Sequence, residues 1–299
     1  LIPICLLFDE PIVLKGSERL FSRSLSVYEE ICKAQGISVI KNENSIALKG
    51  KLKSGKYSVR GDVSSQFITG LLFAATLLEG NSAITIVGKL ESKPYVEMTQ
   101  LALKTFGIDT EDYCVKGQFP FRSPGKLTVE GDWSNGAFWV AAQSLGSPVS
   151  ITGLSEDSLQ GDRAVVDILH DLSQSMATVS ARDIPDLVPI LSVVAAAKHG
   201  AVFTDIRRLR LKESDRVASV IAMIEALGGR VEADENTLRV CGTGLRGGIV
   251  DAMNDHRIAM SAAIAATSAT GPVTIKGAEC VKKSYPKFWD EYSRLGGNL

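Results

Sequence analysis

Residues 254–277 read NDHRIAMSAAIAATSATGPVTIKG, and the layout of this stretch decides the fold because it recurs along the chain. The stretch opens with polar residues, continues as a small-residue apolar segment of helical length, breaks at a glycine and ends in the β-branched run VTIKG. A helix that is apolar on all sides is typical of a buried position. A β-branched run after a glycine break predicts a strand.

Three other segments share this layout, and they are GDVSSQFITGLLFAATLLEGNSAITIVG (61–88), GDWSNGAFWVAAQSLGSPVSITG (131–153) and RDIPDLVPILSVVAAAKHGAVFTDI (182–206). A more amphipathic helix is expected after each of the four segments, in residues 93–108, 162–173, 213–229 and 282–297. Such self-similarity indicates one supersecondary unit used several times. Each unit reads strand, buried helix, strand, exposed helix, strand.

The first 60 residues fit this unit only in part. Residues 1–16 match the back half of a buried helix and its strand, and residues 19–39 match the second helix. We therefore expect a fragment whose first unit lacks its head; an irregular but complete first unit is the alternative. The proline- and glycine-containing run 116–132 marks a boundary. It predicts an incomplete domain at 1–126, with about one and a half of three units, and a second domain of three units at 127–299.

Composition excludes several classes of protein. The chain is 45% hydrophobic and 22% charged with a formal net charge of −1, which is typical of a globular protein and argues against nucleic-acid binding. No apolar run reaches the roughly 18 residues of a membrane helix. The five cysteines are scattered and odd in number, which favours a reducing compartment and a cytoplasmic location. The three histidines lie far apart, so no metal site is expected.

A charged run, RRLRLKESDR (207–216), precedes the amphipathic helix of the third full unit. Ser214 is the expected N-cap, so Lys212, Glu213 and Arg216 cluster at a helix start. Cations at that end oppose the helix dipole, and a bound anion would relieve this conflict. A solvated surface is the alternative interpretation of such a run.

Other helix starts carry groups of the same kind, namely Arg19 with Arg23, Val63 to Gln66, Asn254 to Arg257 and Lys282 to Ser284. Each could be a simple cap or a solvated face, but their repetition at equivalent positions favours an anion site. No phosphate-binding loop, dinucleotide fingerprint or nucleophile elbow is present in the sequence. Acid–base chemistry on an anionic substrate remains, with Asp186 and Glu213 beside Lys212, Arg216, Arg257 and Lys283 as the candidate groups.

Five motifs carry a close resemblance to a known family, and they are GDVSSQF (61–67), DIPD (183–186), LKESDR (211–216), NDHRIAM (254–260) and KSYP (283–286). Over essentially its whole length the sequence resembles the 5-enolpyruvylshikimate-3-phosphate synthase family. The resemblance implies an α/β (α+β) enolpyruvyl transferase fold, an inverse α/β barrel of repeated βαβαββ units in two domains. It also implies that the chain begins inside the second of six units.

The resemblance implies transfer of the enolpyruvyl group of phosphoenolpyruvate to the 5-hydroxyl of shikimate 3-phosphate, with release of phosphate, in chorismate and aromatic amino acid biosynthesis. No metal or organic cofactor is implied, and the family is usually monomeric. The two substrates together carry a charge of about −5 to −6, which explains the need for cations. Shikimate 3-phosphate is expected to contact Ser64, Ser65, Gln66, Ser92, Asp186 and Lys212, with Tyr95 nearby. Phosphoenolpyruvate is expected to contact Arg19, Gln66, Arg216, Arg257 and Lys283.

The resemblance also assigns catalytic roles. Asp186 is expected to accept the proton of the attacking hydroxyl, Glu213 to protonate the methylene carbon, and Lys212 to assist. Arg208 departs from the family pattern, which often has asparagine there. The family's N-terminal Lys-Ser, Arg and Gly-Thr-x-Arg contacts would precede Leu1, so we expect little turnover from this polypeptide alone. The alternatives are the UDP-N-acetylglucosamine enolpyruvyl transferase, whose reactive cysteine loop has no counterpart here, and a non-catalytic anion-binding remnant.

Overall fold

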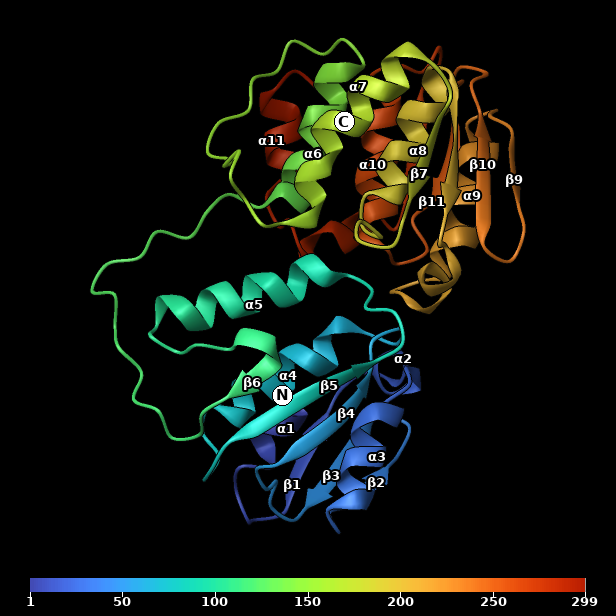
Figure 1. Ribbon diagram of the computed structural model, residues 1–299. Coiled ribbons are helices and arrows are strands. Elements are labelled where there is room, and N and C mark those ends of the chain that lie inside the picture. Colours follow the sequence, from blue (N-terminus) through green and yellow to red (C-terminus); the bar gives the residue numbers. More distant parts are fainter. Residues whose placement is uncertain (299) are drawn as a thin grey trace. The chain divides into compact units, whose positions relative to one another are not determined.

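The computed structural model describes residues 1–298, apart from the side chain of Arg19. The chain forms two compact units, Leu1–Thr128 (unit 1) and Val129–Leu299 (unit 2), and each is described by itself (Figure 1). No helix in the described residues is both long enough and apolar enough to cross a membrane.

Unit 1 contains five α-helices and six strands. The helices are α1 (Ile2–Cys5), α2 (Glu18–Ser22), α3 (Ser26–Ala34), α4 (Ser65–Ala75) and α5 (Lys93–Thr105), with a 3₁₀ turn η1 (Glu111–Tyr113). The strands are β1 (Ile12–Lys15), β2 (Ser38–Lys41), β3 (Ser45–Lys49), β4 (Lys56–Arg60), β5 (Ser82–Val87) and β6 (Cys114–Val115). They form two three-stranded sheets, in the orders β1-β3-β2 and β4-β5-β6.

The apolar segment of unit 1 is buried, as its sequence predicts. Helix α4 carries the buried side chains Phe67, Ile68, Leu71 and Leu72 and packs against α1 and α5. Each such side chain contributes about 1.5–3 kcal/mol through burial. Strands β4 and β5 are parallel and flank α4 in sequence, so the expected strand–helix–strand arrangement is present (Figure 1).

Residues 129–298 of unit 2 contain six α-helices and six strands. The helices are α6 (Trp133–Ser144), α7 (Val165–Gln174), α8 (Val188–Ala197), α9 (Arg216–Ala226), α10 (His256–Ala266) and α11 (Phe288–Arg294), with 3₁₀ turns η2 (Gly161–Ala164), η3 (Arg207–Leu211) and η4 (Ala278–Lys283). The strands are β7 (Ala177–Ser180), β8 (Gly200–Thr204), β9 (Val231–Ala233), β10 (Thr237–Cys241), β11 (Gly248–Asp251) and β12 (Val273–Lys276). They pair in the orders β7-β8-β10-β9 and β11-β12.

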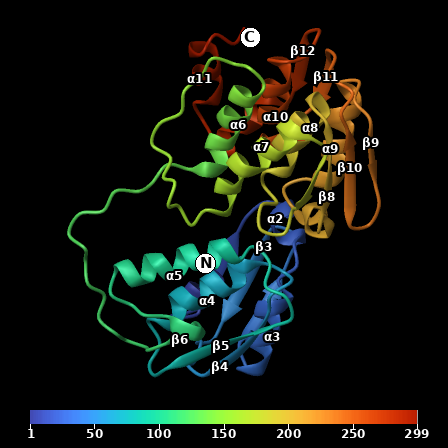
Figure 2. The same cartoon turned by 45° about the horizontal axis from the view of Figure 1, so that its top comes forward.

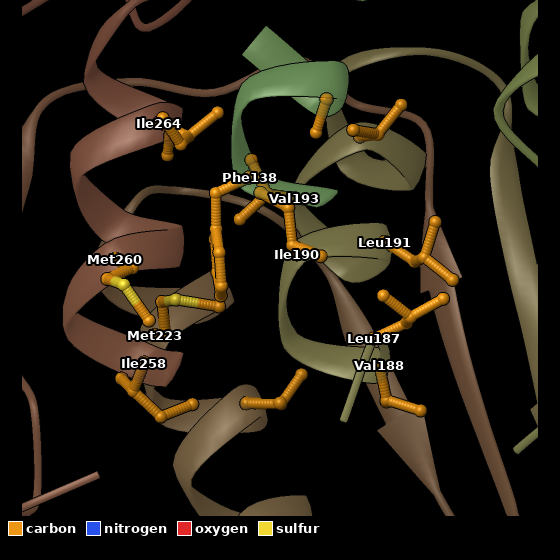
Figure 3. Close-up of a cluster of buried hydrophobic side chains, with 14 of the residues drawn as sticks. Phe138, Leu187, Val188, Ile190, Leu191, Val193, Met223, Ile258, Met260 and Ile264 are labelled. Atoms are coloured by element: carbon orange, nitrogen blue, oxygen red, sulfur yellow. The ribbon is translucent and has the colours of Figure 1, made fainter. Parts of the chain in front are cut away.

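Helices α8 and α10 form the centre of unit 2, and almost every residue of both is buried. Figure 3 shows side chains of α6, α8, α9 and α10 meeting in one cluster, with Phe138, Met223 and Met260 close together. Each central helix follows the first strand of a parallel pair and precedes the second, β7/β8 around α8 and β11/β12 around α10 (Figures 1 and 2). The buried-helix prediction is therefore confirmed, and α8 and α10 each have the strand–helix–strand arrangement that the repeat predicts.

The segment 148–153 departs from the sequence prediction, because no strand forms there. The Val149 amide bonds the nearby Ser147 carbonyl, and the Val149 carbonyl accepts from the Gln143 side chain at 3.1 Å, so neither group is free for a ladder. One backbone bond, from Gly131 N to Gly153 O at 3.1 Å, joins this segment to the start of the repeat. A Cβ at Gly131 would lie 2.4 Å from Gly153 O, so the close approach requires glycine.

Candidate active site

Three acidic N-caps fix the helix starts at one end of unit 2. The side chain of Asp132 accepts from Ser134 N at 2.8 Å at the start of α6, and Asp215 accepts from Ala218 N at 3.1 Å at the start of α9. Asp255 accepts from Arg257 N at 3.0 Å at the start of α10. Each carboxylate satisfies backbone amides that the helix leaves without partners.

The predicted N-cap Ser214 is wrong, because Asp215, one residue later, caps the helix. The Ser214 hydroxyl instead bonds the Asp255 carboxylate at 3.1 Å and the Ser219 hydroxyl at 2.9 Å. Ser214 therefore links the starts of α9 and α10 and is not itself a helix N-cap.

Arg216 is the centre of the charged cluster, and its side chain is 0% exposed. Its guanidinium donates to Asp186 Oδ1 at 2.6 Å, to Glu213 Oε2 at 2.6 Å and to Asp255 Oδ2 at 3.2 Å. The Pro185 carbonyl accepts a further bond at 3.3 Å. A buried cation needs this kind of compensation, because its desolvation is costly. Burial alone would lower the pKa of Arg216, but the three carboxylates outweigh it and raise the pKa.

Asp186 lies between cations from two different helices. Its second oxygen accepts from Arg257 Nη2 at 2.9 Å, and Lys212 Nζ is 4.0 Å from Oδ1. Burial by itself would raise the pKa of Asp186, but Arg257, Arg216 and Lys212 together lower it well below its usual range. The carboxylate is therefore ionised at every pH at which the protein would be studied.

Arg257 joins the starts of α10 and α6. Its Nη1 donates to the Ser134 hydroxyl at 2.8 Å, while Nη2 holds Asp186. The other side-chain N–H groups of Arg257 have no hydrogen-bond partner among residues 1–298. A guanidinium with donors to spare, 11% exposed, suits a carboxylate or phosphate ligand.

Lys283 is held by a strained turn. Its ammonium donates to the Asn254 carbonyl at 2.5 Å and to the Asn254 side-chain oxygen at 2.6 Å. Met253 and Asn254 both have positive φ, at 47° and 58°. That region is uncommon for residues other than glycine, although asparagine tolerates it better than most. The turn aims both oxygens of Asn254 at one cation.

Lys212 and Glu213 are more exposed than Asp186, Arg216 and Arg257. The Lys212 side chain is 24% exposed and that of Glu213 is 34% exposed, against 16% for Asp186. Burial and the charges of Arg216 and Arg208 lower the pKa of Lys212, although Asp186 opposes them. Arg208, which departs from the family pattern, thus acts on the motif lysine through its charge.

The structure brings together five residues that the sequence singled out, namely Asp186, Lys212, Glu213, Arg216 and Arg257, and it holds Lys283 on Asn254, the residue before the Asp255 cap. No group of acidic, cysteine and histidine side chains suited to a metal ion occurs in the described part of the chain. Four cations and the carboxylates among them can bind an anion and exchange protons with it.

The site residues expected in unit 1 lie at one end of a parallel strand pair. Ser64 caps α4 by accepting from Gln66 N at 3.3 Å, and Ser65 is buried. A backbone bond from Glu91 N to Gly61 O at 3.2 Å brings the start of α5 next to that of α4. Ser92, with φ of 54°, is also buried there. The side chain of Arg19 lies outside the described residues.

Sequence reasoning missed Ser134 and Asp162 in unit 2, and it named Asp255 only as part of the helix start Asn254 to Arg257 and not as a site residue. Asp255 is the N-cap of α10, and Ser134 lies in the first turn of α6. The repeat makes these two helix starts equivalent, so a comparison of the repeats could have identified both residues. Asp162 gives no local signal, because it lies in the short turn η2 before an ordinary amphipathic helix.

Comparison with known proteins identifies the family. Residues 1–292 match the family model described as EPSP synthase (3-phosphoshikimate 1-carboxyvinyltransferase). The chain belongs to the EPSP synthase family. A 3-phosphoshikimate 1-carboxyvinyltransferase of Clostridium kluyveri is 40% identical, and the match covers 100% of this chain and 76% of that protein. A relative of the same name from Brachyspira hyodysenteriae is 36% identical over 100% of this chain and 77% of that protein.

Solved structures show the same fold as this EPSP synthase family member. An EPSP synthase from Acinetobacter baumannii superposes with a TM-score of 0.79 at 22% identity, over 100% of this chain and 76% of that chain. The enolpyruvyl transferase NikO from Streptomyces tendae gives a TM-score of 0.76 at 18% identity, over 99% and 75%. The enolpyruvyl transferase fold predicted from sequence is therefore confirmed.

Proposed function

We propose that this chain transfers the enolpyruvyl group of phosphoenolpyruvate to the 5-hydroxyl of shikimate 3-phosphate and releases phosphate. The family membership supports the reaction. The observation that carries the assignment of residues is the Asp186 carboxylate, held at 2.6 Å by Arg216 and at 2.9 Å by Arg257 beside Lys212 and Glu213. An ionised carboxylate among cations can accept a proton while the cations bind the anionic substrates.

Arg257 and Lys283 bind phosphoenolpyruvate in this proposal. Arg257 has side-chain N–H donors without partners among residues 1–298, and Lys283 is an exposed residue at the end of the 3₁₀ turn η4. Arg216 has an indirect role in this proposal. It is fully buried and serves three carboxylates, so a direct contact with phosphoenolpyruvate, as expected from sequence, needs those carboxylates to move.

Asp186 takes the proton of the substrate hydroxyl while the hydroxyl oxygen forms a bond to C2 of phosphoenolpyruvate. A carboxylate whose pKa lies far below its usual range is a weak base. An anionic substrate on Arg257 and Lys212 would share their charge, and this raises the pKa of Asp186. Substrate binding thus makes Asp186 a better base at the moment it is needed.

Glu213 supplies a proton to the C3 methylene of phosphoenolpyruvate in the same addition. Its side chain is 34% exposed and is tied on one side to Arg216 Nη2 at 2.6 Å, so the second oxygen is directed away from that bond. The bond from C2 to the phosphate oxygen then breaks, and C3 returns a proton to Glu213, which restores the vinyl group, while the proton taken by Asp186 leaves with the phosphate. Atoms and charge balance without a redox partner.

The residues of unit 1 complete the proposal by binding shikimate 3-phosphate. Ser64, Ser65, Gln66 and Ser92 lie at adjacent helix starts, where backbone amides and hydroxyls suit phosphate and hydroxyl oxygens. Arg19 remains an expected contact to phosphoenolpyruvate.

Titration calorimetry with phosphoenolpyruvate and shikimate 3-phosphate, followed by a phosphate-release assay, tests the proposal. Arg257→Ala should lose phosphoenolpyruvate binding, while the control Arg230→Ala, an exposed arginine paired to Glu232, should not. Phosphate release with UDP-N-acetylglucosamine in place of shikimate 3-phosphate would contradict the acceptor. Absence of binding to either substrate by the unaltered chain would favour the non-catalytic alternative.

A further inference from the structure

Tyr28 is a buried phenol on helix α3 that the reaction above does not use. The residue is 9% exposed, and its ring packs edge-on against Phe67 of α4, with the ring centroids 4.7 Å apart. The hydroxyl oxygen lies 3.3 Å from the Gln66 carbonyl oxygen and 3.2 Å from that of Phe67. Carbonyl oxygens only accept, so the phenol donates to the first turn of α4. Burial raises the pKa of Tyr28 well above its usual value, so the phenol keeps this proton.

Gly70, one turn further along α4, makes room for that hydroxyl. A Cβ at position 70 would lie 2.3 Å from the Tyr28 hydroxyl oxygen, and the next nearest atoms, in Pro3, would be 3.4 and 3.5 Å away. The hydroxyl is therefore the one neighbour that a methyl group at this position would clash with. Glycine in a helix interior is destabilising relative to alanine, so α4 is weakened at the point where the phenol approaches it.

The carbonyls that Tyr28 holds belong to the segment with the expected contacts to shikimate 3-phosphate. Ser64 caps α4, Ser65 is buried behind it, and Gln66 is exposed. The backbone of Gln66 is held twice, since its amide donates to the Ser64 hydroxyl at 3.3 Å and its carbonyl accepts from Tyr28. A displacement of the phenol would therefore move the side chains of this turn.

A second contact holds another face of α4 against α5. Thr69 precedes Gly70 and lies about 100° from it around the helix axis. The Thr99 hydroxyl donates to the Tyr95 carbonyl at 2.9 Å, so its single proton is used, and Thr69 must donate to Thr99 at 3.0 Å. Contacts on two faces fix the rotation of α4 about its own axis.

We propose that Tyr28 is a positioning residue for the binding of shikimate 3-phosphate, and that Gly70 is required because it admits the phenol. The phenol holds the first turn of α4, so that Ser64, Ser65 and Gln66 meet the substrate in one arrangement. This inference rests on the proposed function in taking shikimate 3-phosphate as the ligand of that turn. In the alternative, a purely structural pair, loss of the hydroxyl lowers stability and leaves the affinity unchanged.

The test is a double-mutant cycle read by calorimetry, with shikimate 3-phosphate titrated into the full chain. Gly70→Ala should weaken binding by about 10-fold, because the added methyl group displaces the phenol and the turn that it holds. Tyr28→Phe keeps the ring and should weaken binding by about 3-fold through the lost hydrogen bond. In the double variant the methyl group occupies the space that the hydroxyl leaves, so the affinity should return to that of Tyr28→Phe. A double variant as weak as Gly70→Ala, or full affinity in either single variant, would overturn the inference.

A matched control separates positioning from lost stability. Ile68→Val removes one buried methyl group from α4 and leaves both the hydroxyl and the space at Gly70 in place. It should lower the thermal midpoint and leave the affinity for shikimate 3-phosphate unchanged. If Ile68→Val weakens binding as much as Tyr28→Phe does, lost stability accounts for both effects and the positioning role fails.

The proposed function and this inference fail in different ways. If the unaltered chain binds shikimate 3-phosphate and Tyr28→Phe binds it equally well, the positioning role fails and the function stands. If the unaltered chain does not bind it, the proposed function fails, and amide hydrogen exchange tests the positioning role without a ligand. Tyr28→Phe should then raise exchange in residues 64–69 more than in the rest of unit 1, and an even rise across unit 1 would overturn the inference.

Discussion

Replacing Arg216 with methionine should strongly destabilise unit 2. Arg216 donates to three carboxylates at 2.6, 2.6 and 3.2 Å from a fully buried position. Hydrogen bonds to charged groups are each worth about 1.5–3 kcal/mol. In the variant, Glu213 is partly exposed and can hydrogen-bond to water, and Asp186 still has its ion pair with Arg257. Most of the lost stability therefore comes from the buried Asp255 carboxylate, which no longer has its arginine partner. We therefore expect a cost of about 3–5 kcal/mol, the usual range for breaking a buried ion pair.

The cost should depend on pH. In the unaltered chain burial would raise the pKa of Asp255, but Arg216 and the Arg257 amide outweigh it and lower the pKa, so stability from this group is present above about pH 4 and constant from pH 5 to 8. In Arg216→Met the fully buried Asp255 loses its cation, and burial then raises its pKa. The variant should gain stability as pH falls from about 8 to about 5, so the difference between the two proteins should shrink.

Urea unfolding followed by tryptophan fluorescence measures this directly. All three tryptophans, Trp133, Trp139 and Trp289, lie in unit 2, so the signal reports that unit alone. Arg230→Met is the matched control, since Arg230 forms an exposed pair with Glu232 and should change stability little. A loss below about 1 kcal/mol, or a loss that stays constant across this pH range, would refute the account of a buried charge cluster.

Three further predictions concern the other members of the cluster. In a chain extended to the full length of its relatives, of which this chain covers 76% in one case, Lys212→Met should weaken calorimetric binding of shikimate 3-phosphate and lower phosphate release, and unchanged binding would contradict its role. In the same extended chain Glu213→Gln should lower phosphate release by about 100-fold or more while phosphoenolpyruvate affinity changes little, as loss of a general acid requires; full activity would exclude Glu213 as that acid. Asn254→Ala should destabilise unit 2 more than Asn254→Gly in urea, because Asn254 has φ of 58°, and both should weaken phosphoenolpyruvate binding through Lys283.

Much of the fold could be predicted from local patterns. The apolar segments of α4, α8 and α10 show their burial directly, since a helix with no polar face has no stable place at a surface. The strand expected at 148–153 failed for a reason outside that segment. The Val149 amide bonds the Ser147 carbonyl, and the Val149 carbonyl accepts from the Gln143 side chain, so neither group can pair with a strand. The sequence pattern of the segment does not indicate these two bonds.

The candidate site was predictable in its membership but not in its arrangement. The sequence by itself determined which helix starts carry cations and acids, because caps and charge runs are local and recur with the repeat. Only the tertiary structure decided that Arg216 is buried behind Asp186 and that Arg257 is the arginine with donors to spare. The reason is physical. Exposure and hydrogen-bond partners depend on which helix starts meet, and Ser134, Asp186 and Arg257 meet across 123 residues of chain through packing that no local pattern encodes.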